Sequence, residues 1–105
     1  MRLDINMAEL ERSKTIILVK PISDNSGKQT WKSIDLHEPA LAEVQQFQDE
    51  GKKGDPLNAM ALLITLLSGI PREVIKKLAF TDYKACEVYL LGFLMYSPTV
   101  ETVGN

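Results

Sequence analysis

The chain has 105 residues, of which 45% are hydrophobic and 25% charged, and 12 Lys and Arg against 14 Asp and Glu give a net charge of -2. This length and composition predict one domain over residues 1–105, with a small core over about residues 14–96 and peripheral ends at 1–13 and 97–105. The slightly acidic balance disfavours a general nucleic-acid binder, because such proteins carry an excess of basic residues.

The first residues of the chain do not form the unbroken apolar run of a secretion signal, since Asp4, Glu9 and Glu11 interrupt them. We therefore expect a protein that stays in the cell that makes it. Asn6 and Glu9 have the spacing of a helix capping box and predict a short helix here. The longest apolar runs fall well short of the roughly 20 residues that span a bilayer, so no membrane helix is expected.

A β-hairpin is predicted to follow. Residues 14–22 (KTIILVKPI) are rich in β-branched side chains and predict a strand, with Pro21 restricted to an edge or to the strand's end. Residues 23–28 (SDNSGK) have the composition of a turn. Residues 30–36 (TWKSIDL) predict the second strand, although their alternation is imperfect.

Helices are predicted for the rest of the chain. Pro39 suits the first position of a helix to about residue 50, whose apolar stripe is Leu41, Val44 and Phe47. A second helix runs from about residue 57 to Gly69, and a short third helix opens at Pro71. Asp55 is the expected cap of the second helix. Thr81 and Asp82 are the expected cap pair of a last helix at about residues 82–96. The predicted class is therefore α+β, an N-terminal β-hairpin followed by a bundle of three to four helices.

Catalytic and metal chemistry have few candidate residues. His37 is the single histidine and Cys86 the single cysteine, so the chain has no disulfide pair and no histidine cluster for a metal. We interpret His37 as a solvated residue after the hairpin, and Cys86 as a buried, inert thiol. We expect no enzyme, no cofactor and no metal site.

The last helix is the feature that most needs explanation. Residues 88–96 (VYLLGFLMY) are apolar around the whole helix, whereas a helix at the surface of a small domain should keep a polar face. We expect the surplus apolar surface to bind a partner, and to allow self-association through this helix. The predicted partner-binding residues are Leu90, Leu91, Leu94 and Met95.

An adjacent face of this helix is assigned to the domain's own core, with Leu91 and Met95 one residue off that face and Leu94 at its boundary. Cys86, Leu90 and Phe93 share that face with Tyr83, so Leu90 belongs to both assignments. On this basis Phe93→Ala is expected to unfold the protein. Leu91→Glu is expected to leave it folded but unable to bind.

The order of these segments resembles the phage tail assembly chaperone family of Mu-like and related contractile-tailed phages and prophages. The resemblance covers residues 14–95 and depends on structural markers rather than on a chemical signature. The markers are the strand ending Lys20-Pro21-Ile22, a glycine-containing turn, the segment Leu36-His37-Glu38-Pro39, the segment from Leu66 to Pro71, Val74, Leu78, Asp82, and Phe93-Leu94.

The resemblance implies a non-catalytic protein of the host cytoplasm that is absent from the mature virion. It further implies that the tape measure protein is the client and that the tail tube protein is a candidate second partner. From the net charge and the short apolar runs we expect binding to neither nucleic acid nor membrane. A different hypothesis is a small regulator that binds nucleic acid through residues 71–96 as a helix-turn-helix. It is disfavoured because residues 88–96 supply almost no polar side chain that could contact a base.

Overall fold

The structure is a computed structural model that describes residues 11–98. It confirms the α+β class, with a two-stranded antiparallel hairpin followed by four helices in the described residues. The helix predicted from Asn6 lies outside them. The elements in chain order are β1 (Ser13–Ser23), β2 (Thr30–His37), α2 (Leu41–Gly51), α3 (Pro56–Ser68), α4 (Arg72–Ile75) and α5 (Phe80–Leu94).

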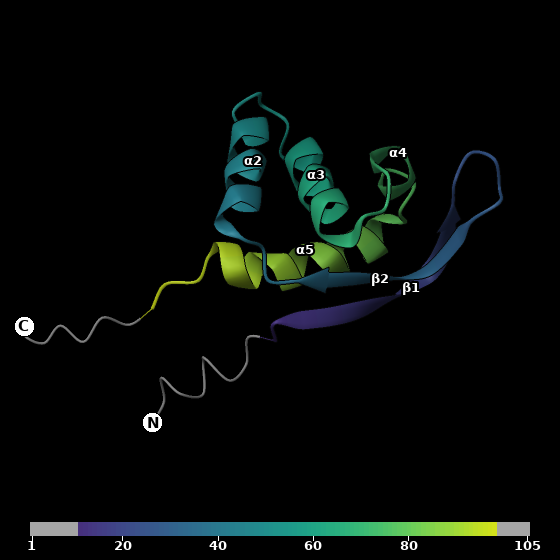
Figure 1. Ribbon diagram of the computed structural model, residues 1–105, viewed down its shortest axis with the longest axis horizontal. Helices are drawn as coiled ribbons and strands as arrows, with labels where there is room; N and C mark the ends of the chain where they lie inside the picture. Colours follow the sequence, from purple (N-terminus) through teal and green to yellow (C-terminus); the bar gives the residue numbers. More distant parts are fainter. Residues whose placement is uncertain (1–10, 99–105) are drawn as a thin grey trace, which may run out of the picture.

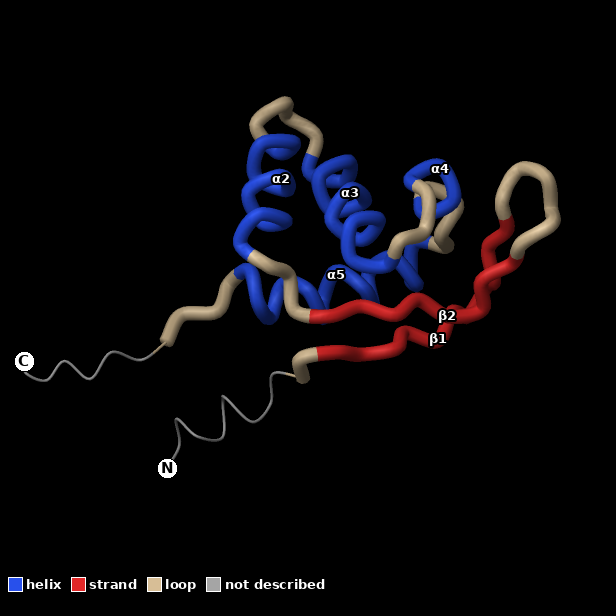
Figure 2. The backbone as a smooth tube through the Cα atoms, in the orientation of Figure 1, coloured by secondary structure: helices blue, strands red, loops and turns tan. Residues whose placement is uncertain are grey.

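The helices cover one side of the hairpin. In Figure 1, α5 runs alongside the two strands, and α2, α3 and α4 stand in a row above them. Contacts join α3 to β2, and both α4 and α5 to β1, while α3 packs between α2 and α4. The hairpin turn extends away from the helices, as the backbone trace of Figure 2 shows. The core therefore lies between the inner face of the hairpin and the helices.

The hairpin separates its side chains by alternation. Ile16 and Leu18 of β1 and Ile34 of β2 face the core and are buried, whereas Ile17 and Val19 face outward and are 73% and 85% exposed. Successive side chains of a strand point to opposite faces, so this pattern follows directly from the sequence. The predicted strands are confirmed, and each extends slightly beyond its predicted range.

A bulge interrupts β1 near its end. Ile17 pairs with Ser33, but the next pairing is Ile22 with Trp31, so β1 contains extra residues opposite Lys32. Pro21 lies in this irregular segment rather than at the end of the strand. Proline has no backbone N–H, and a bulge is one of the few places inside a strand where this donor is not needed.

The bulge is tied to α5 by Asp82. The backbone N–H groups of Val19 and Lys20 donate to the two carboxylate oxygens of Asp82 at 2.9 and 3.0 Å. This side chain is 2% exposed, and the two amide donors compensate for the water that it loses. Its position in the first turn of α5 is also favourable, because the positive end of the helix dipole lies there.

The predicted cap pair Thr81 and Asp82 is therefore wrong. The helix begins at Phe80, its N-cap is Ala79, and no side chain caps it. Asp82 lies within the first turn, three residues after the N-cap, and its carboxylate bonds the strand instead of the helix's own amides. A short polar side chain before an apolar run can either cap the helix or accept hydrogen bonds from another element. The sequence pattern is the same in both cases, so only the tertiary structure distinguishes them.

Two other helix ends agree with the sequence. Asp55 caps α3 by accepting hydrogen bonds from the backbone N–H groups of Leu57 and Asn58, as predicted. Gly69 ends α3 with a φ of 79°, in the left-handed region that glycine adopts without strain. Pro71 precedes α4 as its N-cap. These signals are local, which is why they can be seen in the sequence.

The first predicted helix differs in detail. Pro39 stands before the N-cap Ala40, and α2 begins at Leu41. No residue of α2 is fully buried, and Leu41 is 85% exposed, so the predicted stripe is only partly a core face. Val44 and Phe47 are half-buried. The helix packs mainly on α3, and its first turn extends past the core.

An ion pair joins the three upper helices. The Arg72 Nη2 atom donates to Glu50 Oε2 at 2.9 Å and to the carbonyl oxygen of Asn58 at 3.3 Å. The hydrogen bond from Arg72 holds the pKa of the Glu50 carboxyl below its usual value. The contact connects the end of α2, the start of α3 and the start of α4, and so fixes the ends of these helices relative to each other.

Removing the Asp82 carboxylate should destabilise the fold. Asp82→Ala leaves two amides of the bulge without their acceptor, and we expect the free energy of unfolding to fall by about 3 kcal/mol. Asp35→Ala is the matched control, because its exposed carboxylate accepts a side-chain hydrogen bond from Thr15. The control substitution should lower the free energy of unfolding by about 0.5 kcal/mol or less. Urea unfolding followed by circular dichroism measures both, and equal losses would contradict the anchoring role of Asp82.

Candidate functional site

The four predicted partner-binding residues have different environments. Leu90 is completely buried and belongs to the core, so its side chain is not available to a partner in this structure. Leu91 and Leu94 are half-buried and pack against the core. Met95, at the C-cap of α5, is 73% exposed. The accessible part of the set is therefore the C-terminal end of the helix.

The predicted core face is also only partly as expected. Tyr83 and Cys86 are buried together with Leu90, but Phe93 is half-buried. The Phe93 ring packs edge-on against Tyr89, with 5.3 Å between ring centroids and 85° between planes. Phe93 and Leu91 are thus both intermediate in solvent exposure. The prediction that Phe93 is a core residue and Leu91 a fully exposed one is wrong. The last turn of α5 extends past the core, so its side chains line a surface pocket instead.

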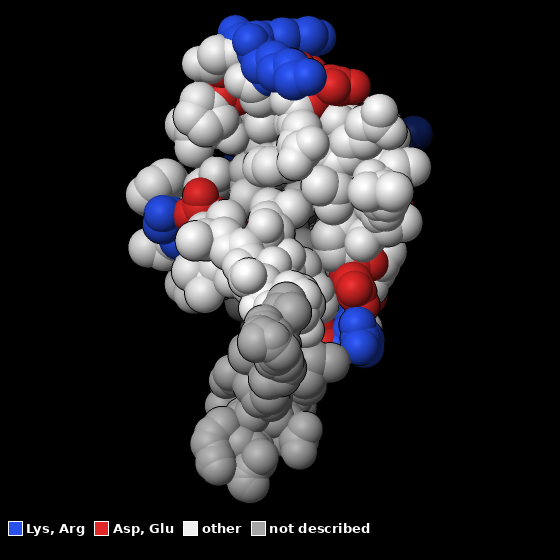
Figure 3. Space-filling view, turned by 90° about the vertical axis from the view of Figure 1, so that its left-hand side faces the viewer, with Lys and Arg blue, Asp and Glu red and all other residues white. Residues whose placement is uncertain are grey.

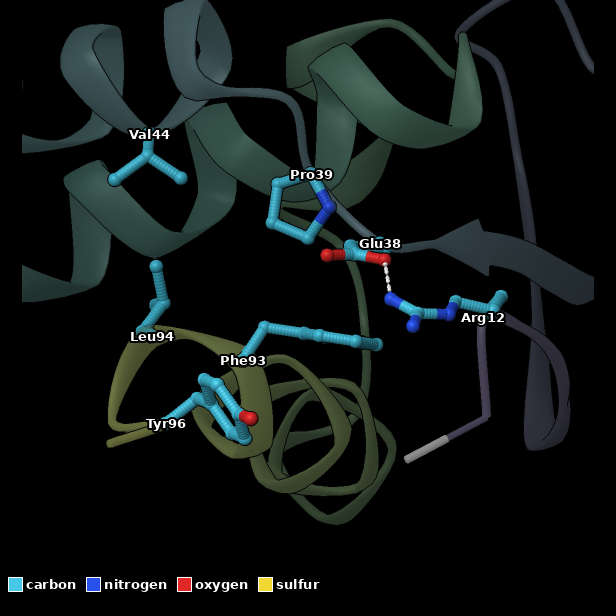
Figure 4. A pocket seen from close by; sticks show the side chains of 7 residues that line it. All are labelled: Arg12, Glu38, Pro39, Val44, Phe93, Leu94 and Tyr96. Atoms are coloured by element: carbon cyan, nitrogen blue, oxygen red, sulfur yellow. Dashed lines mark hydrogen bonds and ion pairs between the residues drawn. The ribbon is translucent and has the colours of Figure 1, made fainter. Parts of the chain in front are cut away.

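This pocket lies where three distant segments meet. Its volume is about 370 Å³, and it opens between the residue before β1, the segment that runs from the end of β2 into α2, and the end of α5. Figure 4 shows Val44 of α2 and Leu94 of α5 pointing toward each other, with Phe93 between Pro39 and Tyr96. The residues that line the pocket are Arg12, Glu38, Pro39, Val44, Phe93, Leu94 and Tyr96.

The rim of the pocket has one ion pair. Arg12 donates to the carboxylate of Glu38, as the dashed line in Figure 4 shows. Both side chains remain largely exposed, so the pair contributes little to stability. Tyr89 adds a second link nearby, because its hydroxyl donates to the carbonyl oxygen of Glu11 at 2.6 Å. These contacts hold the segment before β1 against the end of α5, and so form one wall of the pocket.

The surface around the pocket is apolar. Leu41, Met95 and Tyr96 are exposed there by 85%, 73% and 42%. Figure 3 views the end of the molecule where α2 and the end of α5 lie, and the charged side chains in this view lie toward its edges. We name Leu41, Val44, Phe93, Leu94, Met95 and Tyr96 the α2–α5 surface. An apolar surface of this kind typically contacts another protein.

Sequence reasoning missed part of this surface. The sequence places Leu41 and Val44 in the apolar stripe of the first predicted helix, and it gives no reason to assign Arg12 or Glu38 to a binding surface. The pocket arises because the last turn of α5 lies beside the first turn of α2, some fifty residues earlier in the chain. One signal in the sequence pointed this way. The apolar stripe of residues 41, 44 and 47 is narrow, and a narrow stripe indicates that only a small part of the helix surface packs on the core.

The residues considered for catalysis are not arranged for it. His37 is exposed, and its Nδ1 atom lies 2.9 Å from the carbonyl oxygen of Glu38. Cys86 is completely buried. Over residues 11–98, no three His, Cys, Asp or Glu side chains gather as a metal-binding group. Within the same range, no helix has both the length and the apolar character needed to cross a membrane.

The helix-turn-helix alternative depends on the pair α4 and α5. Helix α4 has only four residues, and α5 packs against β1 with its buried face. A recognition helix needs exposed polar side chains near its N-terminus to contact bases. The exposed side chains at the start of α5 are Phe80, which is apolar, Thr81 and Lys84, and the four-residue α4 is too short to serve as the supporting helix of the motif. The geometry therefore gives this hypothesis no support.

Comparison with known proteins identifies the family. The sequence model of the family described as phage tail assembly chaperone proteins, E, or 41 or 14, matches residues 15–95. The chain belongs to this family. No curated protein and no solved structure matches the chain significantly. The match spans nearly all of the hairpin and all four described helices, and it includes Glu38, Pro39, Val44, Phe93 and Leu94 of the pocket but not Arg12 or Tyr96.

The cysteine of the chaperone should be inert in the folded state. Burial, and secondarily the charge of Asp82, raise the pKa of the Cys86 thiol to about 11. The thiol is thus protonated at pH 8, and the reactive thiolate is scarce. We expect a disulfide exchange reagent at pH 8 to modify the native protein very slowly and the urea-unfolded protein rapidly. Rapid modification of the native protein would contradict the buried position of Cys86.

Proposed function

We propose that this tail assembly chaperone binds the tape measure protein through the α2–α5 surface. The observation that supports the proposal most strongly is the apolar pocket of about 370 Å³ at the end of α5. The client is an apolar helical segment, which the chaperone keeps soluble until the tail assembles. The protein is non-catalytic in this role and acts in the host cytoplasm before the virion is complete.

The size of the pocket suits side chains rather than a whole helix. Its volume lies at the lower end of the roughly 300–1,000 Å³ found for ligand pockets. One or two large apolar side chains of a client helix fit such a space, while the rest of the helix rests on Leu41 and Met95. This is the helix-in-groove mode, in which apolar anchors spaced along one face enter a hydrophobic groove.

The apolar character of the surface explains how a client is kept soluble. Burying apolar surface contributes roughly 25 cal/mol per Å² to the free energy of association. The same hydrophobic effect drives the client's apolar segments to aggregate with each other when no chaperone covers them. Because Leu90 is buried and Leu91 is half-buried, the chaperone exposes less apolar surface than residues 88–96 predict. A limited surface favours a complex that can be reversed when the tail tube protein, the second partner in this proposal, is added.

Charge placed at Met95 should remove client binding without unfolding the protein. Met95→Lys puts a cation at the C-terminal end of α5, where the helix dipole favours it, so folding is not expected to suffer. The charge would enter an apolar interface and leave the complex with an unpaired ammonium group. We expect the tape measure protein, coexpressed with this variant, to move from the soluble to the insoluble fraction.

The matched control is Val19→Lys, which adds the same charge at an apolar residue exposed on the outer face of β1. It should keep the client soluble as well as the natural chain does. Thermal unfolding of both variants shows whether each is folded. If Val19→Lys loses the client and Met95→Lys retains it, the client surface is the hairpin and the proposal is wrong.

A further inference from the structure

A second apolar groove lies at the opposite end of α5. Its volume is about 170 Å³, and it opens between the start of α3, the segment after α4 and the first turn of α5. Leu57 and Phe80 flank it and are 57% and 64% exposed. We name the whole set the α3–α5 groove. Its lining residues are Leu57, Ala61, Ile75, Lys76, Leu78, Phe80 and Tyr83.

Neither flanking residue is required by the fold around it. Leu57 lies directly after Pro56 in the first turn of α3, and Phe80 is the first residue of α5. Polar or acidic residues are favoured at these positions, because the first turn has free N–H groups and the positive end of the helix dipole. Asp55 already caps α3. Two large exposed apolar side chains here therefore serve something outside the domain core.

The phenylalanine is held in place before any partner arrives. The Phe80 ring stacks on Tyr83, with 5.7 Å between centroids and 22° between planes. The ammonium group of Lys84 lies 5.7 Å from the centroid of the same ring. A side chain fixed in this way loses little conformational freedom on binding, which favours its use as an anchor.

The charge at the groove is positive and uncompensated. Lys76 is the one charged residue among those that line it, and its side chain forms no ion pair or hydrogen bond with another described residue. The neighbouring cation Lys84 is paired with Glu87 at 2.6 Å. The carboxylate of Asp55, on the α3 side, already accepts hydrogen bonds from the start of α3. A carboxylate brought by a partner would thus find Lys76 available.

From these observations we infer that the α3–α5 groove docks an amphipathic helix whose apolar stripe is bordered by an acidic residue. Apolar anchors of that helix enter between Leu57 and Phe80, and its carboxylate pairs with Lys76. Phe80 of the groove is the first residue of α5, and Leu94 of the α2–α5 surface is the last. The rise of the helix separates these two residues by about 20 Å. The two surfaces are separate, so this inference goes beyond the proposed function and does not depend on it.

A charge exchange tests the inference. Two synthetic helical peptides share leucines at positions i, i+3, i+4 and i+7, and carry either glutamate or lysine beside this stripe. Fluorescence anisotropy measures their binding to the natural chain and to Lys76→Glu. We expect the natural chain to bind the glutamate peptide about threefold more tightly than the lysine peptide, the size of one exposed ion pair. Lys76→Glu should reverse the preference.

Two further variants locate the peptide. Phe80→Ser should weaken binding of both peptides, whereas Val19→Lys on the outer face of β1, outside both surfaces, should leave the glutamate peptide's affinity unchanged. Circular dichroism confirms that each variant is folded. The inference is overturned if neither peptide binds, if Lys76→Glu does not change the preference, or if Phe80→Ser leaves the binding of both peptides unchanged. A dimer seen in sedimentation and lost in Phe80→Ser would assign the groove to a second copy of the chain and would also overturn it.

Discussion

The hydrogen bonds between Asp82 and the bulge of β1 fix the position of the helix on which both candidate surfaces depend. Two backbone amides, of Val19 and Lys20, share one buried carboxylate, so the start of α5 has a single favourable place on the strand. From that point α5 follows the hairpin, and its middle closes the core with Cys86 and Leu90. The end of the helix then extends beyond the core to meet α2.

This arrangement explains why α5 carries more apolar residues than one buried face requires. A helix packed on one side of a domain would need one apolar face, but α5 meets three different environments along its length. Its first turn flanks the α3–α5 groove with Phe80, its middle is core, and its last turn forms the α2–α5 surface with Leu94 and Met95. Most of the exposed apolar residues of α5 are then accounted for by surfaces suited to protein partners, in agreement with membership of a tail assembly chaperone family; Val88, 67% exposed, lies outside both surfaces.

Features determined by neighbouring residues could be predicted from the sequence. The strands follow from β-branched residues, and the ends of α3 follow from Asp55 and Gly69, because a cap acts within one turn. Features determined by distant residues could not. Asp82 has the local pattern of a cap but bonds a strand more than sixty residues away, and Leu41 continues an apolar stripe although its own side chain is 85% exposed. The pocket was missed for the same reason, since its walls come from three separated segments.

Site-specific photo-crosslinking tests most directly whether the end of α5 is the surface that meets the client. A photoreactive phenylalanine analogue placed at position 95 lies beside the pocket, and the same residue at position 17 lies on the outer face of β1, where Ile17 is equally exposed. With the tape measure protein coexpressed, we expect irradiation to give a cross-linked product from position 95 and none from position 17. Cross-linking from position 17 alone would contradict the account and move the client to the hairpin.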